Sequence, residues 1–461
     1  MRHSYDIVGD LDTPVSAFMK LAAFQPRFLL ESVEGGERLG RYSFIGFGDS
    51  VEYRLDSDAL YINGVRGAPP ADQAALLASL RAALARVARP QPEIAHVPLA
   101  GGLVGYAAYD VVRWFERLPN HARTLPGTPL MHYVAPRSLL VFDHLTRGIS
   151  VLHAGPESER VALRREILRA LHGALPNGRA RGAHSTPVPS LSRADYVDGV
   201  RRAKEAIAAG DVYQLVLSAK FSGRHDLDPF QVYRALRLIN PSPYLYYCRL
   251  GEHAVVGSSP EALVKLERGA AQLRPIAGTR PRGDDAAADA AHEAALRADP
   301  KENAEHVMLV DLARNDLGRV ATAGSVRVEP YRAIERYSHV MHMVSGVHGT
   351  LAAGRDAFDL FAAAFPAGTL VGAPKVRAMQ LIDELEPVRR GLYGGTIGYF
   401  GAQGDMDQAI TIRTLVFNGD EYSFQAGAGI VADSDPDAEY DEVRAKGAAL
   451  VRALALAEEG M

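Results

Sequence analysis

Cysteine is almost absent from this sequence, which has a single one, Cys248, in 461 residues. One cysteine can form neither an intrachain disulfide nor a cysteine-rich zinc site. It lies in the apolar segment YLYYCRL, which is typical of a buried strand, so we interpret it as a core residue. The sequence also has no Gly-x-Cys-x-Gly turn that would present a nucleophilic thiol, so we expect the chain to carry no thiol glutaminase of its own.

Long hydrophobic runs and blocks of one charge are absent as well. No stretch reaches the ~18 apolar residues that a membrane span requires, and the N-terminal residues have no continuous apolar segment of the kind found in signal peptides. The formal net charge is −4, and lysine and arginine are not gathered in long blocks. We therefore expect neither nucleic acid nor a membrane as a partner, a cytoplasmic location, and small anionic ligands.

A segment without hydrophobic periodicity divides the sequence. Residues 173–192, GALPNGRARGAHSTPVPSLS, combine proline, glycine and serine, which indicates a linker or an exposed crossover. Residues 1–175 contain helical patterns and short paired strands, and they predict an N-terminal α+β region. Residues 190–461 form the second predicted region, which begins with an amphipathic helix over Tyr196–Ala209 and the alternating strand DVYQLVLSAKF.

The stretch Gly391–Leu450 combines glycine-rich segments with a charged strand. Period-two alternation along Ala409–Phe417 predicts a strand with apolar residues on one face and Thr411 and Arg413 on the other. The tripeptide at 427–429, Gly-Ala-Gly, predicts a turn whose backbone N–H groups can approach a bound group closely. An arginine and a glycine turn are thereby predicted to lie near each other.

Two helices are predicted to begin with the same Asp-Pro pair, an N-cap residue followed by proline in the first turn. One begins at Asp435 and carries Glu439 and Glu442, with Lys446 one turn further on. Because the spacings are i,i+3 and i,i+4, the three side chains lie close to one face. An alternative is that the carboxylates only complement the positive end of the helix dipole.

The other helix begins at Asp299 and offers Glu302 and Glu305 at the same spacing. Glu302 has an alternative role as half of a capping box, whereas Glu305 lies one turn further in and has no such role. Hard cations such as Mg²⁺ bind through a few carboxylates and keep waters and substrate oxygens in their other positions. The repeated pattern therefore favours a Mg²⁺ site.

Many short segments, taken together and in order, resemble one known family over nearly the whole chain. They are LLESVEGGERLGRYSFIG, DVYQLVLSAKF, NPSPY, GSSPE, RPIAGTRPRG, AEHVMLVDLARNDLGRV, YSHVMHMVSGV, GTLVGAPKVRAM, YGGTIGYF, AITIRT and QAGAGIVADS, followed by the acidic C-terminal helix. This series resembles the chorismate-utilising enzymes and, within them, the large subunit (component I) of anthranilate synthase.

The resemblance implies an α+β fold with large antiparallel sheets packed as a sandwich, flanking helices and a central active-site cleft. It implies a lyase of tryptophan biosynthesis, with residues 190–461 as the chorismate-binding catalytic region. The implied reaction is the Mg²⁺-dependent amination of chorismate with ammonia at C2, followed by pyruvate elimination to anthranilate. A separate glutamine amidotransferase subunit, component II, would supply the ammonia.

The resemblance also assigns roles to individual residues. Residues that match the family's Mg²⁺ ligands or lie beside them are Glu305, Glu442, Glu302 and Glu439. Residues that match its chorismate-binding positions are Gly278, Thr279, Tyr393, Arg413, Gly427, Ala428, Gly429 and Lys446. Glu261 matches the general acid for departure of the C4 hydroxyl, and His342 matches the histidine associated with pyruvate loss. The alternatives are that Glu261 caps a helix over EALVKL and that His342 is structural.

Two positions separate the branches of the family. Members that add water carry a lysine base where this chain has Gln214, and many aminodeoxychorismate synthases carry a nucleophilic lysine where it has Ala277. Ammonia brings its own lone pair and needs no base, so a neutral amide suffices. Gln214 therefore favours ammonia over water as the nucleophile, and Ala277 favours anthranilate formation over the alternative, an aminodeoxychorismate synthase component I.

A regulatory pocket is the last implication of the resemblance. The residues that match the family's allosteric tryptophan site are Ser32, Pro243, Tyr244 and Leu245. Feedback inhibition by tryptophan requires that the ligand bind two states of the enzyme with different affinities. A further alternative, a non-catalytic tryptophan-binding regulatory subunit, is disfavoured because a pure sensor has no use for the carboxylate pairs.

Overall fold

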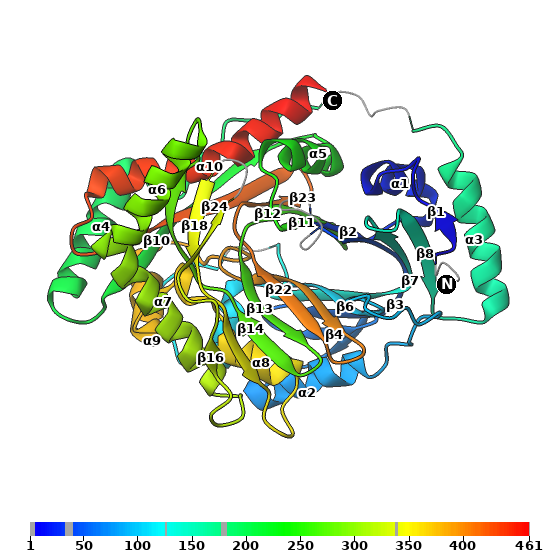
Figure 1. Ribbon diagram of the computed structural model, residues 1–461, viewed down its shortest axis with the longest axis horizontal. Coiled ribbons are helices and arrows are strands. Elements are labelled where there is room, and N and C mark those ends of the chain that lie inside the picture. Colours follow the sequence, from blue (N-terminus) through cyan, green and yellow to red (C-terminus); the bar gives the residue numbers. More distant parts are fainter. Residues whose placement is uncertain (1–4, 33–39, 125–126, 177–181, 337–339, 461) are drawn as a thin grey trace.

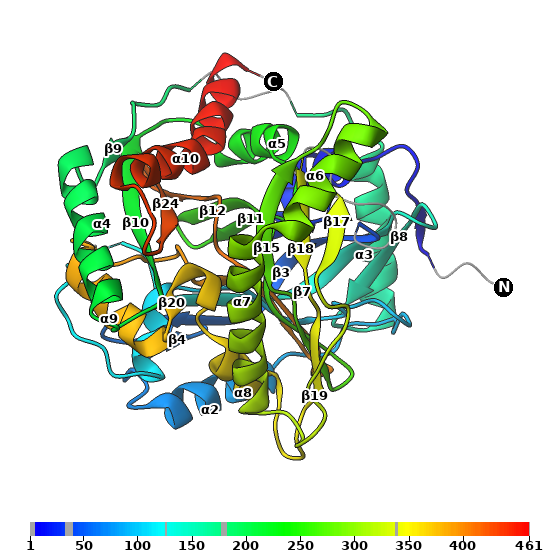
Figure 2. The ribbon, with the colours of Figure 1, turned by 60° about the vertical axis from the view of Figure 1, so that its left-hand side comes forward.

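The computed structural model describes residues 5–32, 40–124, 127–176, 182–336 and 340–460. Within them, apolar alternation produces 21 strands joined into one curled sheet, while three more strands form a small separate sheet. Helices cover the outside of the large sheet (Figures 1 and 2). This confirms the α+β class with large antiparallel sheets and flanking helices.

The strands of the large sheet fall on both sides of the predicted linker at residues 173–192, and β9 lies inside it. The first group is β1 (Ile7–Val8), β2 (Phe28–Glu31), β3 (Tyr42–Leu55), β4 (Leu60–Ile62), β5 (Val65–Gly67), β6 (Gly102–Ala107), β7 (Met131–Asp143), β8 (Gly148–His153) and β9 (Val188–Pro189). The second group is β10 (Gln214–Arg224), β11 (Tyr244–Leu250), β12 (His253–Ser259), β13 (Ala262–Glu267), β14 (Ala270–Leu273), β16 (Arg327–Val328), β19 (Val347–Thr350), β20 (Gly372–Ala373), β21 (Thr396–Gly401), β22 (Met406–Ile410), β23 (Thr414–Asn418) and β24 (Glu421–Ile430). The small sheet contains β15 (Ile276–Pro281), β17 (Ala333–Arg336) and β18 (Val340–Val344).

The large sheet divides into two arms, and every paired strand in it is antiparallel to its neighbour. From β3 the first arm continues through β2, β11, β12, β23, β24 and β10. From β6, which pairs with β7, the second arm continues through β21, β22, β13, β14 and β19. Both arms join N-terminal to C-terminal strands, and the first arm runs above the second in Figure 1.

The chain passes between the two arms at two neighbouring points. It leaves β12 for β13 around residue 260 and leaves β22 for β23 at residues 411–413. The Ile410 N–H group donates to the Glu261 carbonyl (3.0 Å), and the Ser258 N–H group donates to the Arg413 carbonyl (3.1 Å). Glu261 and Arg413 are therefore held side by side at the junction of the arms.

This junction corrects the predicted strand over Ala409–Phe417. The strand β22 ends at Ile410, and β23 begins only at Thr414. Between them Arg413 has φ +49°, a left-handed conformation that interrupts the alternation. Thr411 is consequently buried while Arg413 is exposed, and the two side chains do not share a face. The apolar alternation continued across a change of arm, which periodicity alone does not reveal.

The helices are α1 (Pro14–Lys20), α2 (Gln73–Leu84), α3 (Glu157–Leu171), α4 (Arg193–Ala208), α5 (Pro229–Ile239), α6 (Ala286–Ala298), α7 (Pro300–Gly318), α8 (Ala357–Ala364), α9 (Lys375–Leu385) and α10 (Pro436–Glu459). Short 3₁₀ helices are η1 (Ala22–Phe24), η2 (Tyr109–Trp114) and η3 (Gly368–Leu370). The helix predicted from Tyr196 is α4. The segment after Glu261 is β13, so the alternative of a helix capped by Glu261 is wrong.

Both Asp-Pro helix starts are confirmed. Asp299 accepts hydrogen bonds from the N–H groups of Lys301 and Glu302 at the start of α7, and Asp435 accepts one from Ala438 at the start of α10. Helix α10 packs on β24 and α5, and α7 packs against β15 and α8. Among the described helices, none is long and apolar enough to cross a membrane.

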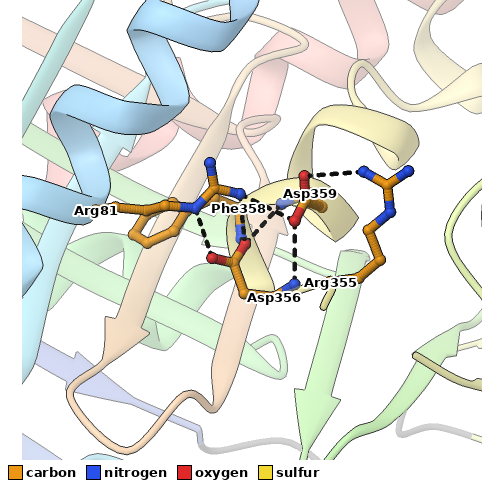
Figure 3. Close-up of polar contacts among 5 residues, drawn as sticks. All are labelled: Arg81, Arg355, Asp356, Phe358 and Asp359. Carbon is orange, nitrogen blue, oxygen red and sulfur yellow. Dashed lines mark hydrogen bonds and ion pairs between the residues drawn. The ribbon is translucent and has the colours of Figure 1, made fainter. Parts of the chain in front are cut away.

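An ion-pair network joins helices that are distant in sequence (Figure 3). Arg81 of α2 donates to both oxygens of Asp356 (2.6 and 3.0 Å) and to Asp359 (2.9 Å). Asp356 is the N-cap of α8, so its carboxylate both caps α8 and binds Arg81 of α2. The N-terminal α2 is thereby fixed to α8, which packs beside the carboxylate helix α7.

Candidate active site

The carboxyl group of Glu261 is set for proton donation. Glu261 is partly buried at the junction of the two arms, and its Oε1 accepts a hydrogen bond from the Thr369 hydroxyl (3.0 Å). Burial raises the pKa of Glu261 to about 7, while the Thr369 hydrogen bond and the nearby positive charge of Arg413 oppose this rise. A substantial fraction of this carboxyl group therefore keeps its proton at neutral pH, as a general acid requires.

His342 faces a bulge in the small sheet. Gly278 has φ +67°, and the pairing of β15 with β18 shifts register between Ala277 and Thr279. Residues 277–279 therefore form a β-bulge inside β15. The bulge brings Thr279 Oγ1 to 3.0 Å and the Gly278 carbonyl to 3.3 Å from His342 Nδ1.

The surroundings of His342 favour a neutral ring. Burial, with the positive charge of Arg413 in addition, lowers its pKa, although the Gly278 carbonyl and Glu335 act in the opposite direction. A neutral imidazole can accept a proton through one ring nitrogen. A ring that can accept a proton therefore lies in the small sheet, whereas the partly protonated carboxyl group of Glu261 lies at the junction.

Glycines in β24 make room for two side chains. A Cβ atom at Gly427 would lie 2.6 Å from the Tyr393 hydroxyl oxygen, and one at Gly429 would lie 2.6 Å from Gln214 Nε2. The predicted glycine turn at 427–429 is wrong, because these residues are part of a continuous strand paired with β10. Ala428 points to the opposite face and is fully buried. The glycines serve close packing of side chains rather than a change of chain direction.

Carboxylates from α7 and α10 approach each other beside Gln214. The Gln214 amide Nε2 lies 3.4 Å from Glu305 Oε1. Burial raises the pKa of Glu305, and the negative charges of Glu302 and Glu442 raise it further. On α10, burial raises the pKa of Glu439, and Glu442 adds to that rise. A divalent cation bound between the two helices would reduce the repulsion among these carboxylates.

Part of this negative charge is already compensated by the protein. Glu302 Oε1 accepts a hydrogen bond from Arg280 Nη1 (2.9 Å). Lys446 Nζ lies 2.7 Å from Glu442 Oε1 and donates to the Gly427 carbonyl (3.0 Å). In the parts of the chain that the structure describes, no three His, Cys, Asp or Glu side chains form a metal-binding group. Mg²⁺ can bind through as few as one or two protein carboxylates, so Glu305 and Glu442 stay a prediction for its ligands.

Sequence reasoning missed the groups that support these side chains. Thr369, from η3, contacts Glu261, and a buried ion pair joins Glu386 to Arg390 behind Tyr393. Thr369 and Glu261 are separated by 108 residues, and neither shows a local pattern that predicts the other. Arg390 lies in the ordinary charged run PVRR, whose burial only the folded structure reveals.

The four residues of the expected regulatory pocket also lie together, in a different part of the first arm. Glu31 of β2 pairs with Leu245 of β11, so the next residue, Ser32, lies opposite Tyr244. The Ser32 hydroxyl is buried, and among the residues that the structure describes it has no hydrogen-bond partner. Tyr244 is tied by its hydroxyl to Asp407 (3.1 Å). A buried, unsatisfied hydroxyl is unfavourable unless a ligand satisfies it.

Comparison with known proteins agrees with this geometry. The family described as chorismate binding enzyme matches residues 25–452. Anthranilate synthase component 1 of Thermus thermophilus is 46% identical over 458 residues, covering 98% of each chain. The Pseudomonas aeruginosa protein of the same name is 44% identical over 475 residues, covering 99% of this chain and 96% of its own. The crystal structure of anthranilate synthase component I from Streptococcus pneumoniae superposes with a TM-score of 0.80 at 33% identity, over 98% of this chain and 100% of that one.

The two glycines of β24 should respond differently to alanine. Gly427→Ala should destabilise the protein by about 1–3 kcal/mol, because its methyl group would meet Tyr393, Ser218 and the Leu217 carbonyl at once. Gly429→Ala should cost less, since only the flexible end of Gln214 must move. Denaturant unfolding of both variants measures the difference. A Gly427→Ala protein as stable as the wild type would contradict the close approach of Tyr393 to β24.

Proposed function

The chain belongs to the chorismate-binding enzyme family, and we propose that it is the chorismate-converting component of an anthranilate synthase. In this function ammonia aminates chorismate at C2, and pyruvate is then eliminated to give anthranilate. One observation carries the choice of nucleophile: the neutral amide of Gln214 lies against Glu305 and Gly429, where water-adding relatives would need an amine base. The full-length similarity to proteins named anthranilate synthase component 1 supports the same choice.

In the first step the lone pair of ammonia forms the bond to C2, which leaves the nitrogen as an ammonium group that later releases one proton to solvent. The two ring double bonds shift, and the C4–O bond breaks. Glu261 donates its proton to the departing oxygen, which leaves as water. The raised pKa of Glu261 supports this role, because the carboxyl group must be protonated before the step. Thr369 remains hydrogen-bonded to the resulting carboxylate and stabilises it.

In the second step the ring loses the proton at C2, and the bond to the enolpyruvyl oxygen breaks. The ring becomes aromatic, and the released enolpyruvate takes up a proton to become pyruvate. We assign the removal of the C2 proton to His342, whose neutral ring is held by Thr279 and Gly278. Aromatisation makes this step favourable, so the protein mainly has to orient the intermediate and accept the proton.

Chorismate carries two carboxylates, and we propose that cationic side chains with backbone N–H groups bind one of them while Mg²⁺ binds the other. Arg413 lies at the junction of the arms, while Lys446 lies above β24 and Tyr393 lies against Gly427. Backbone groups at Gly278, Thr279, Gly427 and Gly429 complete the surface proposed to bind the substrate. Mg²⁺, held by Glu305 and Glu442 with Glu302 and Glu439 nearby, would neutralise one substrate carboxylate. Ala277 has no side-chain amine, so it does not support the covalent chemistry of aminodeoxychorismate synthases.

The proposal includes a second subunit. Relatives of this chain are named component 1, which implies a further component. We propose that this partner is a glutamine amidotransferase that releases ammonia, since this sequence has no nucleophilic-thiol turn. The cytoplasm, where chorismate and glutamine are both available, is the location that this function requires.

The direct test supplies the purified chain with chorismate, Mg²⁺ and ammonium at alkaline pH, where free ammonia is abundant. The products should be anthranilate, identified by mass and fluorescence, and pyruvate. Glutamine in place of ammonium should give no product unless an amidotransferase is added. Formation of a para-amino product, or of isochorismate, would reject the proposed function.

The metal assignment is tested by removing single charges. Glu305→Gln and Glu442→Gln should each weaken Mg²⁺ binding by on the order of tenfold or more, because a neutral amide replaces a carboxylate of similar size. Calorimetry measures binding, and the ammonia reaction measures activity at limiting Mg²⁺. Glu458→Gln is the matched control, since it lies in α10 but pairs with His184. Normal Mg²⁺ binding by both site variants would favour the helix-dipole interpretation of these carboxylates.

Feedback inhibition by tryptophan is tested at Ser32. Tryptophan should bind the wild-type chain in calorimetry and inhibit the ammonia reaction, because the buried Ser32 hydroxyl gains a polar partner. Ser32→Arg should abolish both effects by filling the pocket, while activity without tryptophan persists. Ser158→Arg, at an exposed position of α3, is the control. Unchanged inhibition in Ser32→Arg would show that the regulatory site lies elsewhere.

A further inference from the structure

Behind the proposed active site lies a fully buried ion pair that the mechanism above does not use. Arg390 and Glu386 are each 3% exposed. The pair is bidentate, with Arg390 Nε 2.9 Å from Glu386 Oε2 and Nη2 2.7 Å from Oε1. The backbone N–H and the hydroxyl of Ser218 also donate to Oε1 (2.9 and 2.6 Å). Both charges are therefore satisfied by named partners, so the pair can persist in the interior.

The guanidinium of Arg390 also reaches beyond Glu386. Its Nη1 donates to the Leu370 carbonyl (2.6 Å) and its Nη2 to the Val216 carbonyl (2.8 Å). Its plane lies over the rings of Tyr109 (5.0 Å to the centroid) and Tyr393 (5.4 Å). One side chain thus contacts η3, β10 and the tyrosine that lies against Gly427.

The two carbonyl groups that Arg390 binds lie close in sequence to Thr369, which holds Glu261, and to Gln214. Leu370 follows Thr369 in η3, and Thr369 holds the Glu261 carboxyl group. Val216 lies two residues after Gln214 on the same face of β10. A planar guanidinium can bind two carbonyls and a carboxylate in fixed directions at once, which an ammonium group on a flexible stem does less well.

We propose that Arg390, fixed by Glu386, is a positioning residue that holds Thr369 against Glu261 and sets β10, and with it Gln214, at the correct distance from the substrate. This inference rests on the proposed function for the identity of the reaction. It adds a support for the acid that neither the sequence pattern nor the family match assigns. Arg390 touches no reacting atom and acts only through Leu370, Val216 and Tyr393.

A purely stabilising role is a poor explanation for this pair. Replacing a buried ion pair by apolar side chains is often neutral or stabilising, so burial alone does not explain a charge at this place. The groups around Glu261 allow a specific readout instead. Thr369 and Arg413 favour its ionised form, and Arg274 and Asp316 line a cavity of about 40 Å³ next to it. Displacement of Thr369 removes one of these influences and should change the titration of Glu261.

The main test is Arg390→Lys, which keeps the charge but cannot bind both carbonyls and Glu386 in the same geometry. We expect kcat to fall on the order of 10²-fold, by more than KM for chorismate changes, because misplacement of an acid by about 1 Å has such an effect. At a fixed concentration of free ammonia, the basic limb of the kcat profile should move to higher pH. The sign follows because the Thr369 O–H group favours ionised Glu261, and its loss raises the pKa of this acid.

Two further variants isolate the cause. Arg389→Lys makes the same change one residue earlier, where the partners are Asn120 and Asp110, and should show neither effect. Thr369→Val should shift the basic limb in the same direction as Arg390→Lys. The double variant should shift it no further, since both changes remove the same hydrogen bond.

An unchanged basic limb in folded Arg390→Lys, or additive effects in the double variant, would overturn the proposal. If circular dichroism shows that Arg390→Lys does not fold, Glu386→Gln provides the same readouts with the shape of the pair retained. Failure of both variants to fold would make the pair structural and also overturn it. Difference infrared spectroscopy of Glu261, with Glu261→Gln as the reference, follows the titration without turnover. It separates failure of this inference from failure of the proposed function, which the wild-type products decide.

Discussion

The site depends on the double passage of the chain between the two arms of the large sheet. Two connections cross the same gap side by side, and each supplies the hydrogen-bond partner that the other needs. Ile410 donates to the Glu261 carbonyl, and Ser258 donates to the Arg413 carbonyl. Because buried backbone groups must be paired, neither connection can shift without the other. An acid and a cation are therefore held side by side by backbone constraints, while the Glu261 side chain contacts Thr369 and the Arg413 side chain contacts Asn240.

Burial and neighbouring charges shift the pKa values of the ionisable groups around this junction in opposite directions. Burial raises the pKa of Glu261 and lowers that of His342, which prepares one group to give a proton and the other to accept one. Burial raises the pKa of Glu305, and repulsion from Glu302 and from Glu442 of α10 adds to that rise. Lys446 and Arg280 offset part of that repulsion. A divalent cation held between these helices would reduce the remaining negative charge.

Several features could be predicted from the sequence because their causes are local. The Asp-Pro starts of α7 and α10 were correct, since capping depends only on residues within one turn. The antiparallel α+β class was also correct. The Gly-Ala-Gly turn at 427–429 was wrong, because glycine serves equally for a turn and for close approach inside a strand. The single strand predicted over Ala409–Phe417 was also wrong, because the chain changes arms after Ile410 and local periodicity does not reveal the second arm.

The sequence by itself determined the helix starts, the identity of the side chains at 214 and 277, and the membership in a chorismate-binding family. These follow from residue chemistry and from the order of segments along the chain. Only the tertiary structure decided that Thr369 meets Glu261, that Arg390 lies beside the ring of Tyr393, and that Arg413 is exposed while Thr411 is buried. The physical reason is that each of these contacts depends on strand pairing between segments far apart in sequence. Local propensities and periodicity contain no information on which distant strands pair.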